Sequence, residues 1–248
     1  MLTPRIEELA DGVTLYLGDC LEILPTLSGF DAVVMDPPYA IPTHVAAGRN
    51  NTRSVGDLSL IEATFRSVLE SVRRSLRPGG RAFVFCDGAS YPVMYRAAYS
   101  QFSSALLVWD KGRFGMGREF RKQHELILHL WQSDTPIFTD GVGRPDVLRF
   151  APMGQDREHE AEKPVPLLDH LLTVCGDRIC DPFMGGGSTG IAAIARGKGF
   201  VGIEIEPRFF DMACSRIDAA IKQPRMFAEP RAQREKPPQL ELDATGSK

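Results

Sequence analysis

Short apolar runs rich in Val, Ile, Leu and Phe alternate with amphipathic stretches along most of the chain. In a parallel sheet each strand is buried on both faces and is followed by a crossover helix. The alternation therefore predicts an α/β fold, with a mostly parallel sheet that carries helices on both faces. The expected strands are Val13–Leu17, Ala32–Met35, Ala82–Cys86, Ala105–Trp109, Leu126–Leu130, Arg178–Cys180 and Phe200–Ile203.

The clearest helix is expected from Ser59, because its hydroxyl can cap the chain while Glu62 reaches back from three positions on. Pro78-Gly79-Gly80 is expected to end this helix. Further helices are predicted after Pro164, after the glycines at 185–187, and over Arg208–Ile221.

One domain is expected over residues 1–222, since a chain of 248 residues with 43% apolar residues can bury one sizeable core. Short irregular insertions beside strand ends commonly carry recognition, and they are expected at about 40–57, 111–122 and 132–162. Residues 223–248 mix Pro, Gln, Arg and Glu with few apolar side chains, which predicts a flexible tail.

The composition argues against several classes of protein. No apolar run approaches the roughly 20 residues of a membrane span, and the N-terminus lacks a secretory pattern, so a cytoplasmic protein is expected. The five cysteines lack the close pairs of a zinc site, so no metal is expected. With a formal net charge of −3, the chain would need a local basic surface to bind nucleic acid.

The run 179–190 predicts a strand, a tight turn and the start of a helix. Gly185, Gly187 and Gly190 have the G-x-G-x-x-G spacing that lets a nucleotide approach the backbone. Glu204 follows at the end of the next predicted strand, where a carboxylate can accept hydrogen bonds from both hydroxyls of a ribose. This spacing alone suits a nicotinamide oxidoreductase as well as a methyltransferase.

Two features favour S-adenosylmethionine over a dinucleotide. After Gly187 only one more strand and one more helix are expected, whereas a dinucleotide fold needs two mononucleotide-binding halves. Asp181, at the strand end, would repel a pyrophosphate but attract a ligand that carries an amine and a sulfonium.

The buried run Phe30–Met35 ends abruptly in Asp36-Pro37-Pro38-Tyr39. The two prolines fix the backbone and remove two amide donors, so carbonyl acceptors lie beside the Asp36 carboxylate. A base amine could donate one hydrogen to Asp36 and the other to the Pro37 carbonyl, which would point its lone pair at a methyl donor. Tyr39 offers a flat face on which an extruded base could stack. This catalytic corner therefore predicts an amine as the nucleophile.

Basic residues gather in the segment 111–122, with two phenylalanines and several glycines between them. Such a cluster favours contact with phosphates and separation of DNA strands, and a merely solvated loop is the alternative. Two arginines after the catalytic corner could hold an extruded base or read its neighbours. The predicted DNA-binding residues are Lys111, Arg113, Arg118, Arg121, Lys122, Arg49 and Arg53.

These motifs together resemble the β class of amino-methylating DNA methyltransferases, in which the catalytic motif precedes the cofactor motif. The resemblance covers most of the chain and implies a Rossmann-like methyltransferase fold of permuted motif order, with S-adenosylmethionine as the cofactor. It assigns Asp36, Pro37, Pro38 and Tyr39 to catalysis. It assigns to the cofactor Asp19, Cys20, Lys163, Asp181, Phe183, Gly185, Gly187, Ser188, Thr189 and Glu204.

Asp36 with Tyr39 is similar to the adenine-N6 branch of this family, whereas Ser in the first place is more typical of the cytosine-N4 branch. The resemblance thus implies a site-specific enzyme that methylates N6 of a flipped adenine in DNA. Cytosine-N4 methylation and, less favoured, a nicotinamide oxidoreductase are the alternatives. The intact Asp36 and Glu204 argue against a DNA-binding module without catalysis. DNA is the expected partner, and a homodimer or a restriction endonuclease partner is left open.

Overall fold

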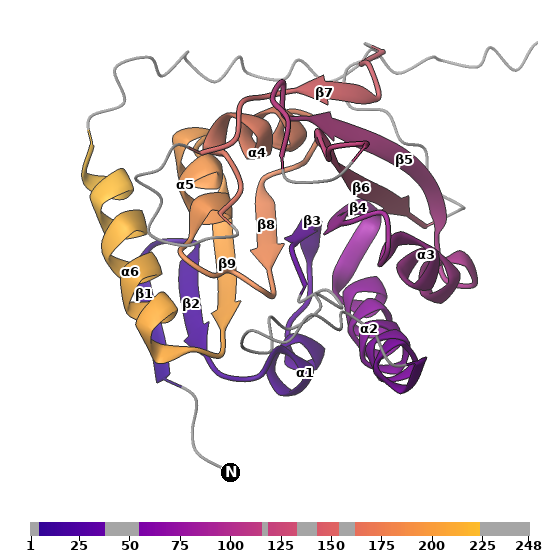
Figure 1. The fold of residues 1–248 in the computed structure, drawn as a ribbon. Helices are drawn as coiled ribbons and strands as arrows, with labels where there is room; N and C mark the ends of the chain where they lie inside the picture. The colour runs from indigo at the N-terminus through magenta and orange to yellow at the C-terminus, as the bar shows by residue number, and fades with distance from the viewer. Residues whose placement is uncertain (1–4, 38–54, 116–118, 133–142, 154–161, 224–248) are drawn as a thin grey trace, which may run out of the picture.

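The computed structural model describes residues 5–37, 55–115, 119–132, 143–153 and 162–223. Within these ranges nine strands form one sheet in the order β1-β2-β9-β8-β3-β4-β6-β5-β7 (Figure 1). The strands are β1 (Arg5–Ala10), β2 (Val13–Leu17), β3 (Phe30–Met35), β4 (Leu76–Cys86), β5 (Ser103–Asp110), β6 (His124–Trp131), β7 (Val147–Arg149), β8 (Arg178–Asp181) and β9 (Gly199–Glu204). The helices are α1 (Cys20–Ile23), α2 (Val55–Ser75), α3 (Tyr91–Tyr99), α4 (Val165–Leu172), α5 (Ser188–Ala195) and α6 (Pro207–Lys222), and a 3-10 turn covers Leu24–Thr26.

The centre of the sheet is parallel. The five strands β2, β9, β8, β3 and β4 pair with one another in parallel. At the two sides of this group, β1 is antiparallel to β2, and β6 is antiparallel to both β4 and β5. Short β7 adds to β5 in parallel. The predicted α/β fold with a mostly parallel sheet is confirmed.

Helices cover both faces of the sheet (Figure 1), and an apolar layer lies between the helices and each face. On one face, buried residues of α4, α5 and α6, such as Leu168, Ala193 and Phe210, pack on the strands. On the other face, α1, α2 and α3 bury side chains such as Val68 and Met94. The helices expected after Pro164, after the glycine turn and near the C-terminus all lie on the first face.

The helix expected from Ser59 differs at both ends. α2 begins earlier, at Val55, and Pro78-Gly79-Gly80 lies inside β4 instead of ending the helix. Phe30 of β3 pairs with Leu76 while Ala32 pairs with Arg81, so the residues between Leu76 and Arg81 bulge out of the ladder. Gly79, with φ of 84°, accommodates this bulge, because glycine adopts positive φ without strain.

Sequence reasoning missed β1, β7, α1 and α3. β1 is an amphipathic edge strand without a strong apolar run, and β7 is three residues long. α3, in contrast, could have been predicted from its sequence. The Asp87 carboxylate accepts hydrogen bonds from the Ala89 and Ser90 amides just before the helix, and Tyr91, Tyr95 and Tyr99 follow at helical spacing.

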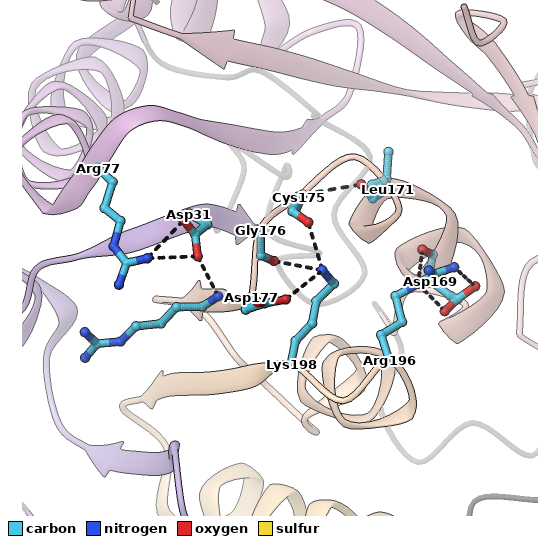
Figure 2. A network of polar contacts seen from close by, with 10 residues as sticks. Asp31, Arg77, Asp169, Leu171, Cys175, Gly176, Asp177, Arg196 and Lys198 are labelled. Carbon is cyan, nitrogen blue, oxygen red and sulfur yellow. Dashed lines mark hydrogen bonds and ion pairs between the residues drawn. The ribbon is translucent and has the colours of Figure 1, made fainter. Parts of the chain in front are cut away.

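A polar network ties together the amino-terminal ends of the central strands (Figure 2). The Asp31 carboxylate accepts a hydrogen bond from the Arg178 amide (2.9 Å) and lies 3.3 Å from Arg77 Nη1, which links β3, β8 and β4. Lys198 Nζ donates to two backbone carbonyls of the turn before β8, both at 2.8 Å. The network fixes this edge of the sheet, so the opposite edge, where the parallel strands end, is left for a ligand site.

Gly190, the third glycine of the motif, lies inside α5. A Cβ atom there would stand 2.8 Å from Phe200 Cε1 and closer still to Ile217 Cδ1, and both of these residues are fully buried. Gly190→Val is therefore expected to lower the free energy of unfolding by about 1–3 kcal/mol, because the core must shift to admit the side chain. Urea denaturation would measure this. Gly88→Val is the matched control, since a Cβ at Gly88 would meet nothing within 4 Å, and equal losses in both variants would contradict the close packing.

Candidate active site

Three carboxylates stand at the carboxyl ends of adjacent parallel strands. Asp36 follows β3, Asp181 ends β8 and Glu204 ends β9. Because β9, β8 and β3 are neighbours in the sheet, these residues share one edge, and they line a cavity of about 450 Å³. The carboxyl edge is where open α/β sheets bind ligands, and the volume suits a small molecule.

The two motifs found in the sequence meet in this cavity. Asp36 and Pro37 of the catalytic corner form part of its wall. Gly187 is not among its lining residues; with φ of 84° and its amide donating to the Met184 carbonyl (2.9 Å), it turns the chain into α5. The other residues predicted for the cofactor all line the cavity, namely Asp19, Cys20, Lys163, Asp181, Phe183, Gly185, Ser188, Thr189 and Glu204.

The Glu204 carboxylate is held in one orientation by backbone amides. Its Oε2 accepts from the Gly185 amide (2.8 Å) and its Oε1 accepts from the Glu206 amide (2.9 Å). A carboxylate oxygen has two lone pairs, so each oxygen can accept a second hydrogen bond from the cavity side. The arrangement can therefore receive a pair of ligand hydroxyls.

Asp181 is a buried carboxyl group with a strongly shifted pKa. Burial raises its pKa to about 7, against hydrogen bonds from the Thr189 hydroxyl and the Phe183 amide, and the nearby charges of Asp36 and Glu204 raise the pKa further. A cation bound beside it would favour the ionised form. The position suits the ammonium or sulfonium of a ligand.

The hydroxyl groups of Ser188 and Thr189 already have partners within the protein. Ser188 Oγ donates to Glu162 Oε1 (2.8 Å), and Arg216 of α6 pairs with the same carboxylate and donates to the Gly186 carbonyl (2.7 Å). The contacts that the family resemblance implies for these hydroxyls would require them to share or exchange partners. Glu162 and Arg216 were not predicted, since neither belongs to a spaced motif.

Asp19 and Cys20 form the wall beside β9. Asp19 caps α1, because its Oδ1 accepts from the Leu21 amide (2.8 Å), and the Gly18 amide donates to the Glu204 carbonyl (2.9 Å). Burial, with the charge of Asp19, raises the pKa of the Cys20 thiol to about 12. Cys20 therefore presents a neutral thiol to the cavity.

Lys163 is the one cationic side chain among the predicted cofactor residues, and it lies close to carboxylates of the protein. Its Nζ lies 2.5 Å from Asp36 Oδ2 and 3.4 Å from Glu125 Oε2, and it stacks 5.1 Å from the centre of the Phe85 ring. The assignment of Lys163 to the cofactor stays a prediction, and two of its partners are the carboxylates of Asp36 and Glu125. Glu125 was not predicted as a site residue.

The basic segment between β5 and β6 lies at the same edge as the cavity, because β5 ends and β6 begins there. Asp110 braces its two ends. This carboxylate accepts hydrogen bonds from Gln123 (3.0 Å), from the Gly112 amide (2.8 Å) and from Arg149 of β7 (2.9 Å), and together they lower its pKa to about 2.

The predicted DNA-binding side chains divide into two groups. Arg113, Arg121 and Lys122 are exposed, as are Phe114 and Phe120, at 67% and 94%. Lys111 instead turns inward, with its Nζ 2.5 Å from Glu125 Oε1, because the partly buried carboxylate attracts it away from solvent. Pro38, Tyr39, Arg49, Arg53 and Arg118 lie outside the described residues.

In the part of the chain that the structure describes, no helix has the length and apolar character needed to cross a membrane. In the same ranges, no three His, Cys, Asp or Glu side chains form a group that could hold a metal ion, and the absence of a metal stays a prediction.

Comparison with known proteins gives consistent results. The model of the DNA methylase family of N6 and N4 methyltransferases matches residues 30–215. The type II methyltransferase M.ScaI of Streptomyces caespitosus is 25% identical over 263 aligned residues, covering 84% of this chain and 82% of that protein.

Solved methyltransferase structures share the fold. TTHA0409 of Thermus thermophilus, solved with S-adenosyl-L-methionine, superposes with a TM-score of 0.63 at 20% identity, covering 84% of this chain and 95% of that one. The PvuII DNA methyltransferase, which is cytosine-N4-specific, has a TM-score of 0.63 at 16% identity, over 87% and 88% of the two chains. The match of residues 30–215 to the DNA methylase family model excludes the alternative of a nicotinamide oxidoreductase. The family model covers three quarters of the chain, and the chain belongs to the DNA methylase family of amino-methylating DNA methyltransferases.

Proposed function

We propose that the protein methylates the exocyclic N6 amine of adenine in DNA, and that Asp36 and Pro37 receive this amine. The observation that carries the proposal is the meeting of the catalytic corner with the carboxylates of Asp181 and Glu204 in one cavity. An amine acceptor thus lies directly beside a nucleoside pocket. Transfer of a group between the two requires this proximity.

S-adenosylmethionine is the cofactor of this family, and it supplies a methyl group bound to a positively charged sulfur. The cavity suits its chemistry. Glu204 would hold the ribose hydroxyls, Asp181 would face the ammonium, and Asp19 would lie at the adenine end. Phe183 and the main chain at Gly185 would line its length.

Asp36 and Pro37 would prepare the amine for attack. The Asp36 carboxylate accepts one N–H and the Pro37 carbonyl the other, which draws the nitrogen lone pair out of conjugation with the ring. The nitrogen would form its bond to the methyl carbon as the methyl–sulfur bond breaks, with the electron pair of that bond left on the sulfur. The adjacent carboxylate would stabilise the positive charge that develops on the nitrogen until the amine loses a proton to solvent. The chain needs no nucleophile of its own, in agreement with cysteine thiols whose pKa values are raised by burial.

The choice of adenine rests on Asp36, since its combination with Tyr39 is similar to the adenine-N6 branch. Cytosine-N4 methylation is the second candidate, because one structural neighbour is specific for that amine. Incubating unmethylated genomic DNA with methyl-labelled cofactor, followed by digestion to nucleosides, separates them. Label in N6-methyl-2′-deoxyadenosine supports the proposal, label in N4-methyl-2′-deoxycytidine selects the second candidate, and absence of label in DNA rejects both. A homodimer, an endonuclease partner and a cytoplasmic location stay predictions.

Cofactor binding is expected to depend on pH through Asp181. Below its pKa of about 7 this carboxyl group is protonated in the empty protein, so a cationic ligand must displace the proton. Affinity for S-adenosylmethionine is expected to fall about tenfold per pH unit below 7 and to level off above it. Calorimetric titrations across this range would measure the profile. Asp181→Asn should bind weakly without this dependence, and a flat wild-type profile would be inconsistent with the assignment.

The exposed basic residues of the segment 111–122 are expected to contact DNA phosphates. Changing Arg113, Arg121 and Lys122 together to Ala should weaken DNA binding and lower the slope of log affinity against log salt by about 2 to 3, while cofactor affinity is unchanged. Arg66, Arg73 and Arg74 of α2, changed together to Ala, remove the same charge at another surface. Fluorescence anisotropy at several salt concentrations would show the difference, and an equal loss from both triple variants would reduce the effect to net charge.

A further inference from the structure

Four side chains of alternating charge form a continuous row of ion pairs, the charged row, beside the cavity. Lys111 Nζ lies 2.5 Å from Glu125 Oε1, Glu125 Oε2 lies 3.4 Å from Lys163 Nζ, and Lys163 Nζ lies 2.5 Å from Asp36 Oδ2. They come from four places in the fold: Lys111 follows β5, Glu125 lies at the start of β6, Lys163 precedes the N-cap of α4, and Asp36 follows β3. The charged row therefore joins the basic segment to the catalytic corner.

Lys163 is the most buried member of the charged row. Its side chain is 9% exposed, against 21% for Asp36 and 22% for Glu125, and its ammonium also lies over the Phe85 ring. Burial opposes the charged form of Lys163, but the attraction of Asp36 and Glu125 outweighs it and raises the pKa of the lysine. Glu125 behaves in the same way: burial would raise its pKa, but Lys163 and Lys111 together lower it. A lysine is rarely buried without such partners.

A residue that binds the cofactor would be expected to have different surroundings from those of Lys163. S-adenosylmethionine carries an ammonium and a sulfonium, which the Lys163 ammonium would repel. It could attract only the carboxylate of that cofactor, yet its Nζ is already held between two carboxylates of the protein. The contact with Asp36, in contrast, falls on the residue that must present an oxygen to the substrate amine.

We propose that Lys163 is a positioning residue for Asp36, and that Glu125, itself held by Lys111, positions Lys163. Lys163 binds Oδ2 of Asp36 and so fixes the rotation of the carboxylate about its Cβ–Cγ bond. Removing it allows the carboxylate to rotate, and small errors in the placement of a reacting group are costly. The proposal deepens the proposed function and rests on it.

Lys163→Met, which keeps an unbranched side chain as far as Cε but removes the ammonium, tests this role. It is expected to lower kcat for DNA methylation about 100-fold while the Kd for S-adenosylmethionine changes less than about threefold. Lys163→Arg should recover part of the lost kcat, because it keeps a donor towards Asp36. Wild-type protein that transfers no methyl group would reject the proposed function, whereas active wild type with an equally active Lys163→Met rejects the positioning role alone.

A second variant, Glu125→Gln, tests whether Glu125 acts on Asp36 through Lys163. It should lower kcat about tenfold, and the double variant should be no slower than Lys163→Met, because Glu125 acts through Lys163. Independent, multiplying losses would overturn this order. If Lys163→Met weakens the Kd for the cofactor tenfold or more but changes kcat little, Lys163 is instead a residue that binds the cofactor.

Lys198→Met is the matched control for loss of a buried lysine. Lys198 is 11% exposed and binds backbone carbonyls at the opposite edge of the sheet (Figure 2). It is expected to lower stability without changing kcat of the folded fraction. If Lys163→Met does not fold, the milder Glu125→Gln decides: a lower kcat with unchanged cofactor Kd supports the role, and an unchanged kcat overturns it.

Discussion

Asp36→Ala is expected to lower the rate of methyl transfer by about 1,000-fold or more. The substitution removes the carboxylate that accepts the substrate amine and stabilises its developing charge. Since the carboxylates of Asp181 and Glu204 remain, affinity for S-adenosylmethionine should stay within a few fold of the wild type. Single-turnover transfer of labelled methyl groups to DNA would measure the rate, and calorimetry the affinity.

Asp36→Asn separates charge from shape at this position. The amide keeps one acceptor oxygen but loses the negative charge, so this variant should also be slow, although faster than Asp36→Ala. If both variants keep activity within about tenfold of the wild type, the electrostatic role of Asp36 is wrong. If both lose cofactor affinity in parallel with activity, Asp36 belongs to the cofactor pocket instead.

Glu204→Gln is expected to weaken binding of S-adenosylmethionine by about 10 to 100-fold, which corresponds to the loss of one or two charge-assisted hydrogen bonds. Both oxygens of Glu204 accept from backbone amides, at Gly185 and at Glu206. The amide nitrogen of Gln must therefore oppose one of these donors. The ribose would lose an acceptor and the glycine turn would lose its brace.

The kinetic signature of Glu204→Gln should differ from that of the Asp36 variants. At saturating cofactor, kcat should recover most of its wild-type value, because the catalytic corner is intact. Glu70→Gln, an exposed glutamate on α2 that pairs with Arg74, serves as the charge-matched control and should leave both constants unchanged. Wild-type cofactor affinity in Glu204→Gln would contradict the assignment of the ribose to this residue.

Most of the fold could be predicted because its signals are local. Each central strand is an apolar run that ends at a polar, Gly or Pro residue, and each of the larger crossover helices shows its own periodicity. The errors occurred where local signals compete. Pro78-Gly79-Gly80 has the composition of a helix stop, but pairing of Leu76 and Arg81 with β3 absorbs it as a bulge within β4.

The candidate site could be predicted in part for the same reason. The catalytic corner and the glycine turn are contiguous motifs, and their meeting in one cavity follows from the sheet order. The Lys163–Asp36 pair joins residues 127 positions apart, and Glu125 carries no motif that marks it. Side-chain partners of this kind depend on how distant strands and loops pack, so spacing along the sequence contains no signal for them.

The most direct test of the account is the methylation pattern of DNA from cells that express the protein and lack other DNA methyltransferases. Sequencing that detects modified bases should find N6-methyladenine at every copy of one short sequence, and none in cells that express Asp36→Ala. Absence of modified adenine in wild-type cells, or N4-methylcytosine in its place, would contradict the proposed adenine-N6 activity.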